Sequence, residues 1–306
     1  MIRPGTLDDV PRAAAMRQRA WPDSIITEEG MRHSLENVPE RAELLMLAWE
    51  EGGEIVGWVT AGHEWWTSEP HRGTLMVAVD PARRGEGIGS ALAAAADEHL
   101  AAIGVRTTRA GSLDEPGARA LATRLGFREI AASATSALDP RTVVPEPVPD
   151  DVRIVPFADL DDPRALYDLD VEVSNDIPNE EFDGVSFEEW RGEFWRSPLI
   201  HQDASLAAYV GGELAALTMI RIDEPSGRAE NNVTGTRRAF RGRGLARLLK
   251  SHSLSLAGRL GATIVLTDND ETNAPMLAVN RKLGYRPFAR RIEWERSPPA
   301  TDTGGA

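Results

Sequence analysis

Hydrophobic and polar positions alternate along the chain in blocks that predict the same elements, in the same order, in both halves. Thr74–Val79 is a β-branched apolar run typical of a strand, and Asp80 and Pro81 end it. An alanine-rich segment from about Ile88 to Gly104 predicts a helix. Each half reads as a helix, a long polar stretch, a strand hairpin, a strand, a glycine-rich turn, a helix, a strand, a helix and a strand. This order predicts an α/β fold with a mixed sheet.

Short motifs recur in order, which indicates a tandem duplication. A proline followed by Leu-Asp-Asp, an apolar strand that turns at Gly-Gly, a glycine-rich turn that begins with Arg-Gly and a Leu-Gly-aromatic triplet each occur twice. Four such pairs in one order are hard to obtain by chance. The pairs begin at Pro4 and Pro156, Ala48 and Ala208, Arg84 and Arg241, and Leu125 and Leu283.

The duplication predicts two domains, residues 1–143 and 151–297. Alternating prolines at positions 145, 147 and 149 favour an extended connector, so we expect residues 144–150 to form a Pro-rich linker. We expect residues 298–306 to be a disordered tail.

Each half carries a glycine-rich turn between a strand and the N-terminus of a helix. Backbone N–H groups and the helix dipole converge there, and glycine lets the oxygens of an anion reach the amides. Both turns therefore resemble diphosphate cradles, with a plain tight turn as the alternative. A Walker loop is excluded, because neither Gly89 nor Gly244 is followed by Lys-Ser/Thr. A dinucleotide fingerprint would lie at the first strand-to-helix turn, whereas this turn comes late in each repeat.

Residues 79–89 read Val-x-Pro-x-x-Arg-Gly-x-Gly-x-Gly and resemble the acyl-CoA loop of the GNAT N-acetyltransferases. The second half resembles the same family through Thr234–Thr236, Arg241–Ala246 and Asn273–Tyr285. The resemblance implies two tandem acyl-CoA N-acyltransferase domains, each a mixed, mostly antiparallel sheet flanked by helices, with acetyl-CoA or CoA as the cofactor. It implies that the pyrophosphate lies on the glycine-rich turns and the pantetheine beside the preceding strands. The implied cofactor-binding residues are Val77, Val79, Arg84, Gly85, Gly87, Gly89, Thr234, Thr236, Arg241, Gly242, Gly244 and Ala246.

Composition narrows the classes of protein that fit. The 306 residues include 48 acidic and 34 basic side chains, and the formal net charge of -14 argues against a nucleic-acid partner. The absence of cysteine excludes disulfides, thiolate nucleophiles and cysteine-ligated zinc, and we expect no metal site. No apolar run approaches about 18 residues and no signal peptide is recognisable. We therefore expect a cytoplasmic protein without a membrane span, as a monomer or homodimer.

One stretch departs from the acidic balance of the chain. Between Asn231 and Thr267 there is no acidic residue, and an anionic ligand and a solvated helix face both explain the basic residues that gather there. These residues, called the basic island below, are Arg237, Arg238, Arg241, Arg243, Arg247, Lys250 and Arg259.

Acyl transfer from a thioester to an amine needs a deprotonated amine, a place for the oxyanion and support for the leaving thiol. Many family members support the thiol with a tyrosine four residues before the glycine of the Leu-Gly-aromatic triplet, but Ala122 and Asn280 occupy those positions here. Asn280 and Asn273 either assist the sulfur or brace their loop. Glu230 resembles the strand glutamate that acts as base in the histone-acetyltransferase branch, with a solvated carboxylate as the alternative.

The first half has Gly73 where the second has Glu230, and nearby His71 is either an exposed loop residue or a proton carrier. We therefore expect the C-terminal domain to catalyse transfer of acetyl to a primary amine of a small molecule. The N-terminal domain is expected to bind CoA or to be structural, and the reverse division remains open. A non-enzymatic CoA-binding sensor or scaffold is the alternative function.

The acceptor side of each repeat precedes the strand hairpin. The acidic run Ser174–Asp183 is either solvated or steers a cationic amine toward the cleft. Phe187, Trp190 and Phe194 recur at helical spacing, which favours core packing over a substrate-binding cluster.

Overall fold

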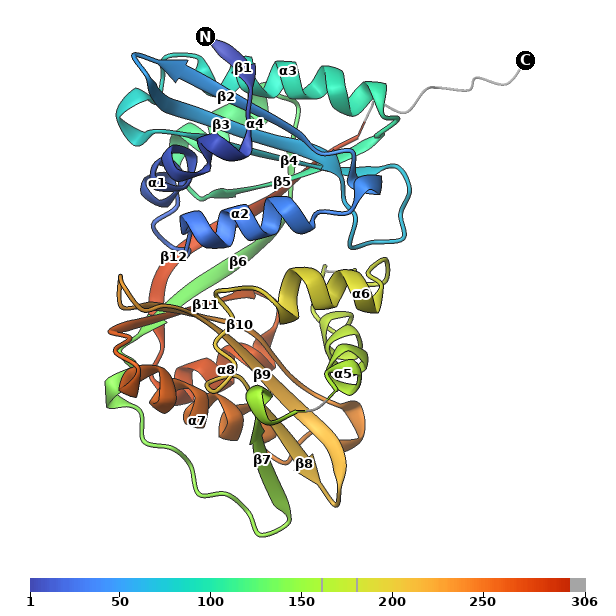
Figure 1. Ribbon diagram of the computed structural model, residues 1–306, viewed down its shortest axis with the longest axis vertical. Coiled ribbons are helices and arrows are strands. Elements are labelled where there is room, and N and C mark those ends of the chain that lie inside the picture. Colours follow the sequence, from blue (N-terminus) through green and yellow to red (C-terminus); the bar gives the residue numbers. More distant parts are fainter. Residues whose placement is uncertain (161, 180, 298–306) are drawn as a thin grey trace, which may run out of the picture. The chain divides into compact units, whose positions relative to one another are not determined.

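The computed structural model describes residues 1–160, 162–179 and 181–297 (Figure 1). The expected tail at 298–306 lies outside these residues. The chain forms two compact units. Unit 1 contains Met1–Trp21, Val38–Ala132 and residues 290–297, and unit 2 contains Pro22–Asn37 and the described part of Ser133–Ala289.

Unit 1 is built on a mixed sheet in the order β1-β2-β3-β4-β5-β12. Neighbouring strands are antiparallel except β4 and β5, which run parallel. The helices α1 and α3 pack on the sheet at β3 and β4, and α4 follows β5. The bounds are β1 Ile2–Pro4, α1 Val10–Ala20, β2 Leu45–Glu51, β3 Glu54–His63, β4 Arg72–Val79, α3 Ile88–Ala102, β5 Thr107–Leu113, α4 Pro116–Arg124 and β12 Arg286–Arg296.

Unit 2 repeats this plan in the order β7-β8-β9-β10-β11-β6, with β10 and β11 as its parallel pair. A short π-helical turn, Arg191–Trp195, continues α6. The prediction of α/β domains with mixed, mostly antiparallel sheets flanked by helices is confirmed. The bounds are α2 Glu28–Asn37, β6 Arg128–Leu138, β7 Val152–Pro156, α5 Arg164–Ser174, α6 Phe187–Trp190, β8 Leu206–Val210, β9 Glu213–Asp223, β10 Arg228–Thr236, α7 Leu245–Arg259, β11 Ile264–Asp270 and α8 Ala274–Leu283.

The last strand of each sheet comes from the other sequence repeat. In unit 1, Arg291–Arg296 of β12 pair with Thr108–Leu113 of β5. In unit 2, Ser133–Leu138 of β6 pair with Val265–Asp270 of β11. The division into compact units therefore differs from the division into repeats at 1–143 and 151–297. Each exchanged strand is 11 residues long. Its C-terminal six residues pair with the sheet that the other repeat supplies.

The first repeat also supplies a helix to unit 2. Within that unit, Ser34 Oγ of α2 donates to Glu193 Oε1 at 2.7 Å, and burial raises the pKa of the Glu193 carboxyl above its usual range. The segment predicted as linker, residues 144–150, lies along α7 of the same unit. There the Glu146 amide donates to Ser251 Oγ at 3.0 Å, and Arg247 pairs with the Glu146 carboxylate at 2.6 Å.

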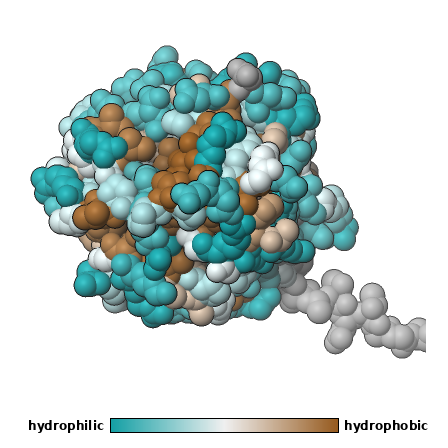
Figure 2. All heavy atoms as spheres, turned by 90° about the horizontal axis from the view of Figure 1, so that it is seen from below, coloured by the Kyte–Doolittle hydropathy of each residue, from teal (hydrophilic) through white to brown (hydrophobic). Residues whose placement is uncertain are grey.

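Apolar side chains of sheets and helices form the core of each unit. In unit 1, Val59, Leu92, Ala96 and Ile292 have no exposed surface, and in unit 2 the same holds for Ile220, Leu254 and Val265. On the face drawn in Figure 2, hydrophilic residues cover most of the surface and hydrophobic ones gather toward the middle. None of the helices in the described part of the chain is long and apolar enough to cross a bilayer.

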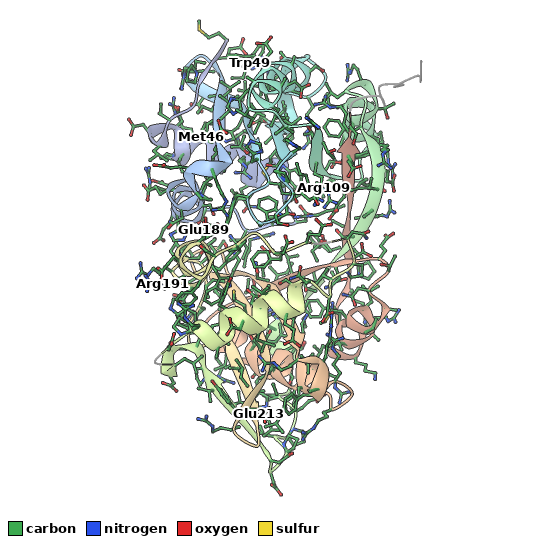
Figure 3. The ribbon with its side chains drawn as sticks, turned by 90° about the vertical axis from the view of Figure 1, so that its right-hand side faces the viewer. Met46, Trp49, Arg109, Glu189, Arg191 and Glu213 are labelled. Atoms are coloured by element: carbon green, nitrogen blue, oxygen red, sulfur yellow. The ribbon has the colours of Figure 1, made fainter. Side chains whose placement is uncertain are left out.

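The predicted aromatic cluster packs in unit 2. Trp190 is fully buried, and its indole Nε1 donates to Asp170 Oδ2 of α5 at 2.7 Å. Phe187 and Phe194 are half-buried on the same helical segment, where Figure 3 labels Glu189 and Arg191. Glu189 closes a capping box with Ser186, which explains why the helix begins there.

Asp170 gives a testable prediction on stability. Burial raises its pKa from 3.8 to about 6, so the unfolded chain loses this proton at lower pH than the folded one. Stability should therefore fall as pH rises from about 4 to 6 and stay lower above 6. Asp170→Asn keeps an acceptor for Trp190 and removes the charge, so it should stabilise the protein at pH 7.5 by up to about 3 kcal/mol.

Urea unfolding of Asp170→Asn and wild type from pH 4 to 8 measures this effect. Asp168→Asn is the matched control, because Asp168 lies exposed on the same helix, and it should change little. An Asp170→Asn protein less stable than wild type at pH 7.5 would contradict the assignment.

Candidate active site

The parallel strands of unit 1 open a cleft. β4 and β5 pair at Arg72–Thr74 and Thr107–Arg109 and then diverge. Arg109, labelled in Figure 3, is the last residue of β5 in this pairing. A cavity of about 750 Å³ fills the opening, between Leu75–Val79 of β4 and Ala110–Leu113 of β5. Since β4 remains paired to β3 up to Val79, its other edge offers free backbone groups to an extended ligand.

The first glycine-rich turn lies at one end of this cavity. Gly87 is the N-cap of α3 with φ of 86°, a left-handed conformation that favours glycine, and a Cβ there would meet no protein atom. The space in front of the helix N-terminus is therefore open to an anion. The six residues predicted in this half all line the cavity: Val77, Val79, Arg84, Gly85, Gly87 and Gly89.

The second turn has the same backbone geometry in unit 2. Gly244 is the N-cap of α7 with φ of 78°, and here too a Cβ would meet only open space. Thr234 and Thr236 lie on β10, which leads into the turn. Arg241 Nε donates to Thr236 O at 3.2 Å and thereby ties the turn to the strand. Gly242 and Ala246 complete the predicted cradle, with Ala246 in the first turn of α7.

Five of the seven residues of the basic island form ion pairs with carboxylates of unit 2. Arg238 and Arg241 both bind Asp176, which belongs to the acidic run predicted to be solvated or to steer an amine. Residue 180 of that run lies outside the described residues. The other ion pairs are Arg237 with Glu172 at 3.3 Å, Arg243 with Asp151 at 2.5 Å and Arg247 with Glu146 at 2.6 Å. These acidic partners offset the positive charge that the sequence alone displays.

A β-bulge distinguishes β10 from its counterpart β4. β10 pairs with β9 at Asn231 and then at Val233, so Asn232 is an extra residue. Buried Asn231 fixes the bulge, because its Nδ2 donates to Thr218 Oγ1 at 3.0 Å and its Oδ1 accepts from Thr234 Oγ1 at 3.0 Å. The pairing of β3 with β4 runs without a register shift. Sequence reasoning missed this feature, although two consecutive asparagines in a predicted strand were a signal.

Glu230 lies at the point where the parallel strands of unit 2 separate. It pairs in register with Leu266, the last of three such positions between β10 and β11. Its side chain is 22% exposed, and Arg221 Nη1 lies 3.6 Å from Glu230 Oε2. Because of the bulge, the residue at the corresponding register of unit 1 is Thr74, which pairs with Arg109, and not Gly73. His71 is exposed in the loop before β4.

Asn273 and Asn280 have different environments. Asn273 is the N-cap of α8, and its side chain accepts a hydrogen bond from Met276 N at 3.3 Å. This contact corresponds to the alternative in which Asn273 braces its loop. Asn280 is 2% exposed and accepts from Lys250 Nζ at 2.7 Å. Lys250 was predicted only as part of the basic island. Its helical spacing from Leu254 and Ala257, both buried, was the signal that it faces inward.

Two strands that diverge beside a glycine-rich helix N-terminus, found in both units, define the acyl-CoA-binding class of acetyltransferase folds. The sequence profile of the Acetyltransferase (GNAT) family matches residues 13–127 and 166–285. The chain therefore belongs to the GNAT family, in tandem form, and its members are N-acetyltransferases that generally use acetyl-CoA. In the described residues, no group of three or more His, Cys, Asp or Glu side chains is placed to hold a metal ion.

Similar proteins that match over most of the chain support this placement. The chain is 28% identical over 294 residues to the mycothiol acetyltransferase of Streptomyces bingchenggensis, covering 94% of this chain and 92% of that protein. It is 31% identical to that of Nocardia farcinica over 251 residues, covering 78% of each. A solved tandem GNAT protein from the clavulanic acid biosynthesis pathway shares the fold, with a TM-score of 0.74, 24% identity and coverage of 98% and 99%.

Proposed function

We propose that this protein transfers the acetyl group of acetyl-CoA to a primary amine of a small molecule, and that unit 2 carries the reaction. The observation that carries the proposal is the place of Glu230, a carboxylate where β10 and β11 separate, on the strand that leads into a glycine-rich turn. Unit 1 binds acyl-CoA or has a structural role. The proposal includes a cytoplasmic protein that acts as a monomer or homodimer, without nucleic-acid or membrane partners.

The residues at both glycine-rich turns fit CoA. Backbone N–H groups around Gly87 and Gly244 would hold the pyrophosphate, since each is a helix N-cap with open space in front of it. The free edges of β4 and β10 would bind the pantetheine as an added strand. Bound acetyl-CoA supplies the activated acetyl group as a thioester.

In unit 2, Glu230 accepts the proton of the attacking amine, and Arg221 holds the carboxylate in place from the adjacent strand. The acetyl group passes from sulfur to nitrogen as the C–N bond forms and the C–S bond breaks. The Asn280 amide would support the departing sulfur. These roles need no tyrosine, because a CoA thiol has a pKa near the cysteine value of about 8.5 and leaves readily as thiolate.

The cavity of unit 1 favours binding without turnover. Among the described residues that line it, the one carboxylate is Glu115, and Arg84 Nη1 donates to Glu115 Oε2 at 2.7 Å beside the glycine-rich turn. The residue at the register of Glu230 is Thr74, and the position of Asn280 is taken by Ala122. This wall offers no side chain that accepts a proton at the thioester.

Thiol release from acetyl-CoA tests the function. The amine panel includes the acceptor of the mycothiol acetyltransferases, because a relative that matches 94% of this chain, and 92% of its own length, carries that name. We expect release above the amine-free background with at least one primary amine. Tight CoA binding with no release for any amine would replace the enzyme with a CoA-binding sensor.

A further inference from the structure

Unit 2 contains a buried polar cluster formed by α7, α8 and β11. Lys250, on α7, is 1% exposed, and its Nζ donates to Asn280 Oδ1 at 2.7 Å and lies 5.2 Å from the ring centroid of Tyr285. Asn280 in turn donates from Nδ2 to Asn269 Oδ1 at 2.5 Å. Burial of a lysine is costly, and it lowers the pKa of Lys250 to about 7. A lysine kept in such a place calls for an explanation.

Unit 1 lacks this cluster at every corresponding position. Lys250, Asn280, Asn269 and Tyr285 are matched by small or apolar residues, namely Ala93, Ala122, Ser112 and Phe127. Three of these, Ala122, Ser112 and Phe127, line the cavity of unit 1. Asn280 and Asn269 therefore occupy positions whose counterparts in unit 1 line the ligand cavity, whereas the counterpart of Lys250, Ala93, belongs to the core of unit 1. The two units therefore differ at all four positions of the cluster.

Lys250 determines which way the Asn280 amide points. The protonated ammonium of a lysine has donors only, so it faces the amide oxygen and not the amide nitrogen. With Oδ1 held by Lys250, Nδ2 must point away from it, and one of its two hydrogens goes to Asn269. The second hydrogen remains as a donor. Without Lys250 the amide can turn over, which would direct an oxygen at the sulfur and repel the charge that develops there.

We propose that Lys250 is a positioning residue of the acetyl-transfer site, which holds the Asn280 amide so that its second N–H faces the thioester sulfur. The idea rests on the proposed function of unit 2. When the C–S bond breaks, its electron pair leaves with the sulfur, and this N–H donates to the thiolate. The amine proton goes to Glu230, and the acetyl group goes to the amine nitrogen. Lys250 touches neither substrate and acts through Asn280.

Lys250→Met tests the proposal, because methionine has a similar length, fits an apolar site and donates no hydrogen bond. We expect kcat to fall roughly 10- to 100-fold with KM for acetyl-CoA nearly unchanged, since the lost interaction strengthens as the bond breaks. Asn280→Ala should cause a similar loss, and the double variant should lose no more than either single one. Lys250→Gln, which retains an N–H donor, should recover part of the rate.

Arg259→Met is the matched control, since Arg259 is exposed at the end of the same helix, and it should leave kcat unchanged. Thermal unfolding shows whether each variant folds. If Lys250→Met does not fold, the rate of Lys250→Gln is used to test the proposal instead. Two results would overturn the role of Lys250 while leaving the reaction in unit 2. One is additive losses in the double variant. The other is a full rate in Lys250→Met when Asn280→Ala and Glu230→Gln are slow. Full rates in all three would instead refute the placement of the reaction in unit 2.

Discussion

Glu230→Gln is expected to lower kcat/KM by about 10²- to 10⁴-fold, which is the usual contribution of a general base. Glutamine keeps the shape of the side chain and its hydrogen bonding but cannot accept a proton. The loss should be largest below the pKa of the acceptor amine, where the acceptor is an ammonium ion and deprotonation limits the rate. A pH profile of kcat/KM for variant and wild type measures it.

Glu213→Gln is the control for the loss of one carboxylate, because Glu213 is exposed at the start of the neighbouring strand β9 (Figure 3). It should leave the profile unchanged. If Glu230→Gln keeps the full rate while substitution of His71 abolishes it, the N-terminal unit is the enzyme and our division of roles is wrong.

Gly87→Glu and Gly244→Glu should each remove one CoA site, so that calorimetry finds one site per chain in each variant and two in the wild type. The added carboxylate would occupy the open space before a helix N-terminus and repel the pyrophosphate. Affinity at the altered site should fall roughly 100-fold or more, because charged hydrogen bonds to several amides are lost together.

Backbone strain alone must be separated from this effect, since both glycines have a positive φ. Gly53→Glu and Gly212→Glu provide that control, because these hairpin glycines have φ of 85° and 90° and equally open surroundings. They add the same strain and charge away from the cradles and should leave two sites. Unchanged stoichiometry in Gly87→Glu and Gly244→Glu together would refute both cradles.

Local features of this fold could be predicted from the sequence because each depends on neighbouring residues. The turn before Ile88 is recognisable from glycines, a proline and an arginine within 11 positions. The helix α3 that follows has about the length that the alanine-rich segment suggests. The strand order of each repeat follows from apolar runs and turns in the same way. The short first strands, Ile2–Pro4 and Val152–Pro156, were missed because three to five residues show too little alternation.

Features that depend on distant partners could not be predicted. The bulge at Asn232 appears only when β10 is aligned with β9, and it moves the counterpart of Glu230 from Gly73 to Thr74. The exchange of β6 and β12 involves residues more than 120 positions apart, and either repeat alone is consistent with a self-contained sheet. The inward direction of Lys250 was visible in its spacing, but lysine is rarely buried and the solvated alternative was the natural expectation.

The exchanged strands make the two repeats depend on each other for folding. A cut in the Pro-rich linker would give one fragment without β12, leaving β5 with an open edge, and another without β6, leaving β11 in the same condition. Open edges of this kind recruit strands from other chains. Each fragment carries the strand that the other fragment lacks. Mixing the two fragments would therefore allow both sheets to be completed. Deleting either repeat would therefore expose an unpaired strand edge in the repeat that remains.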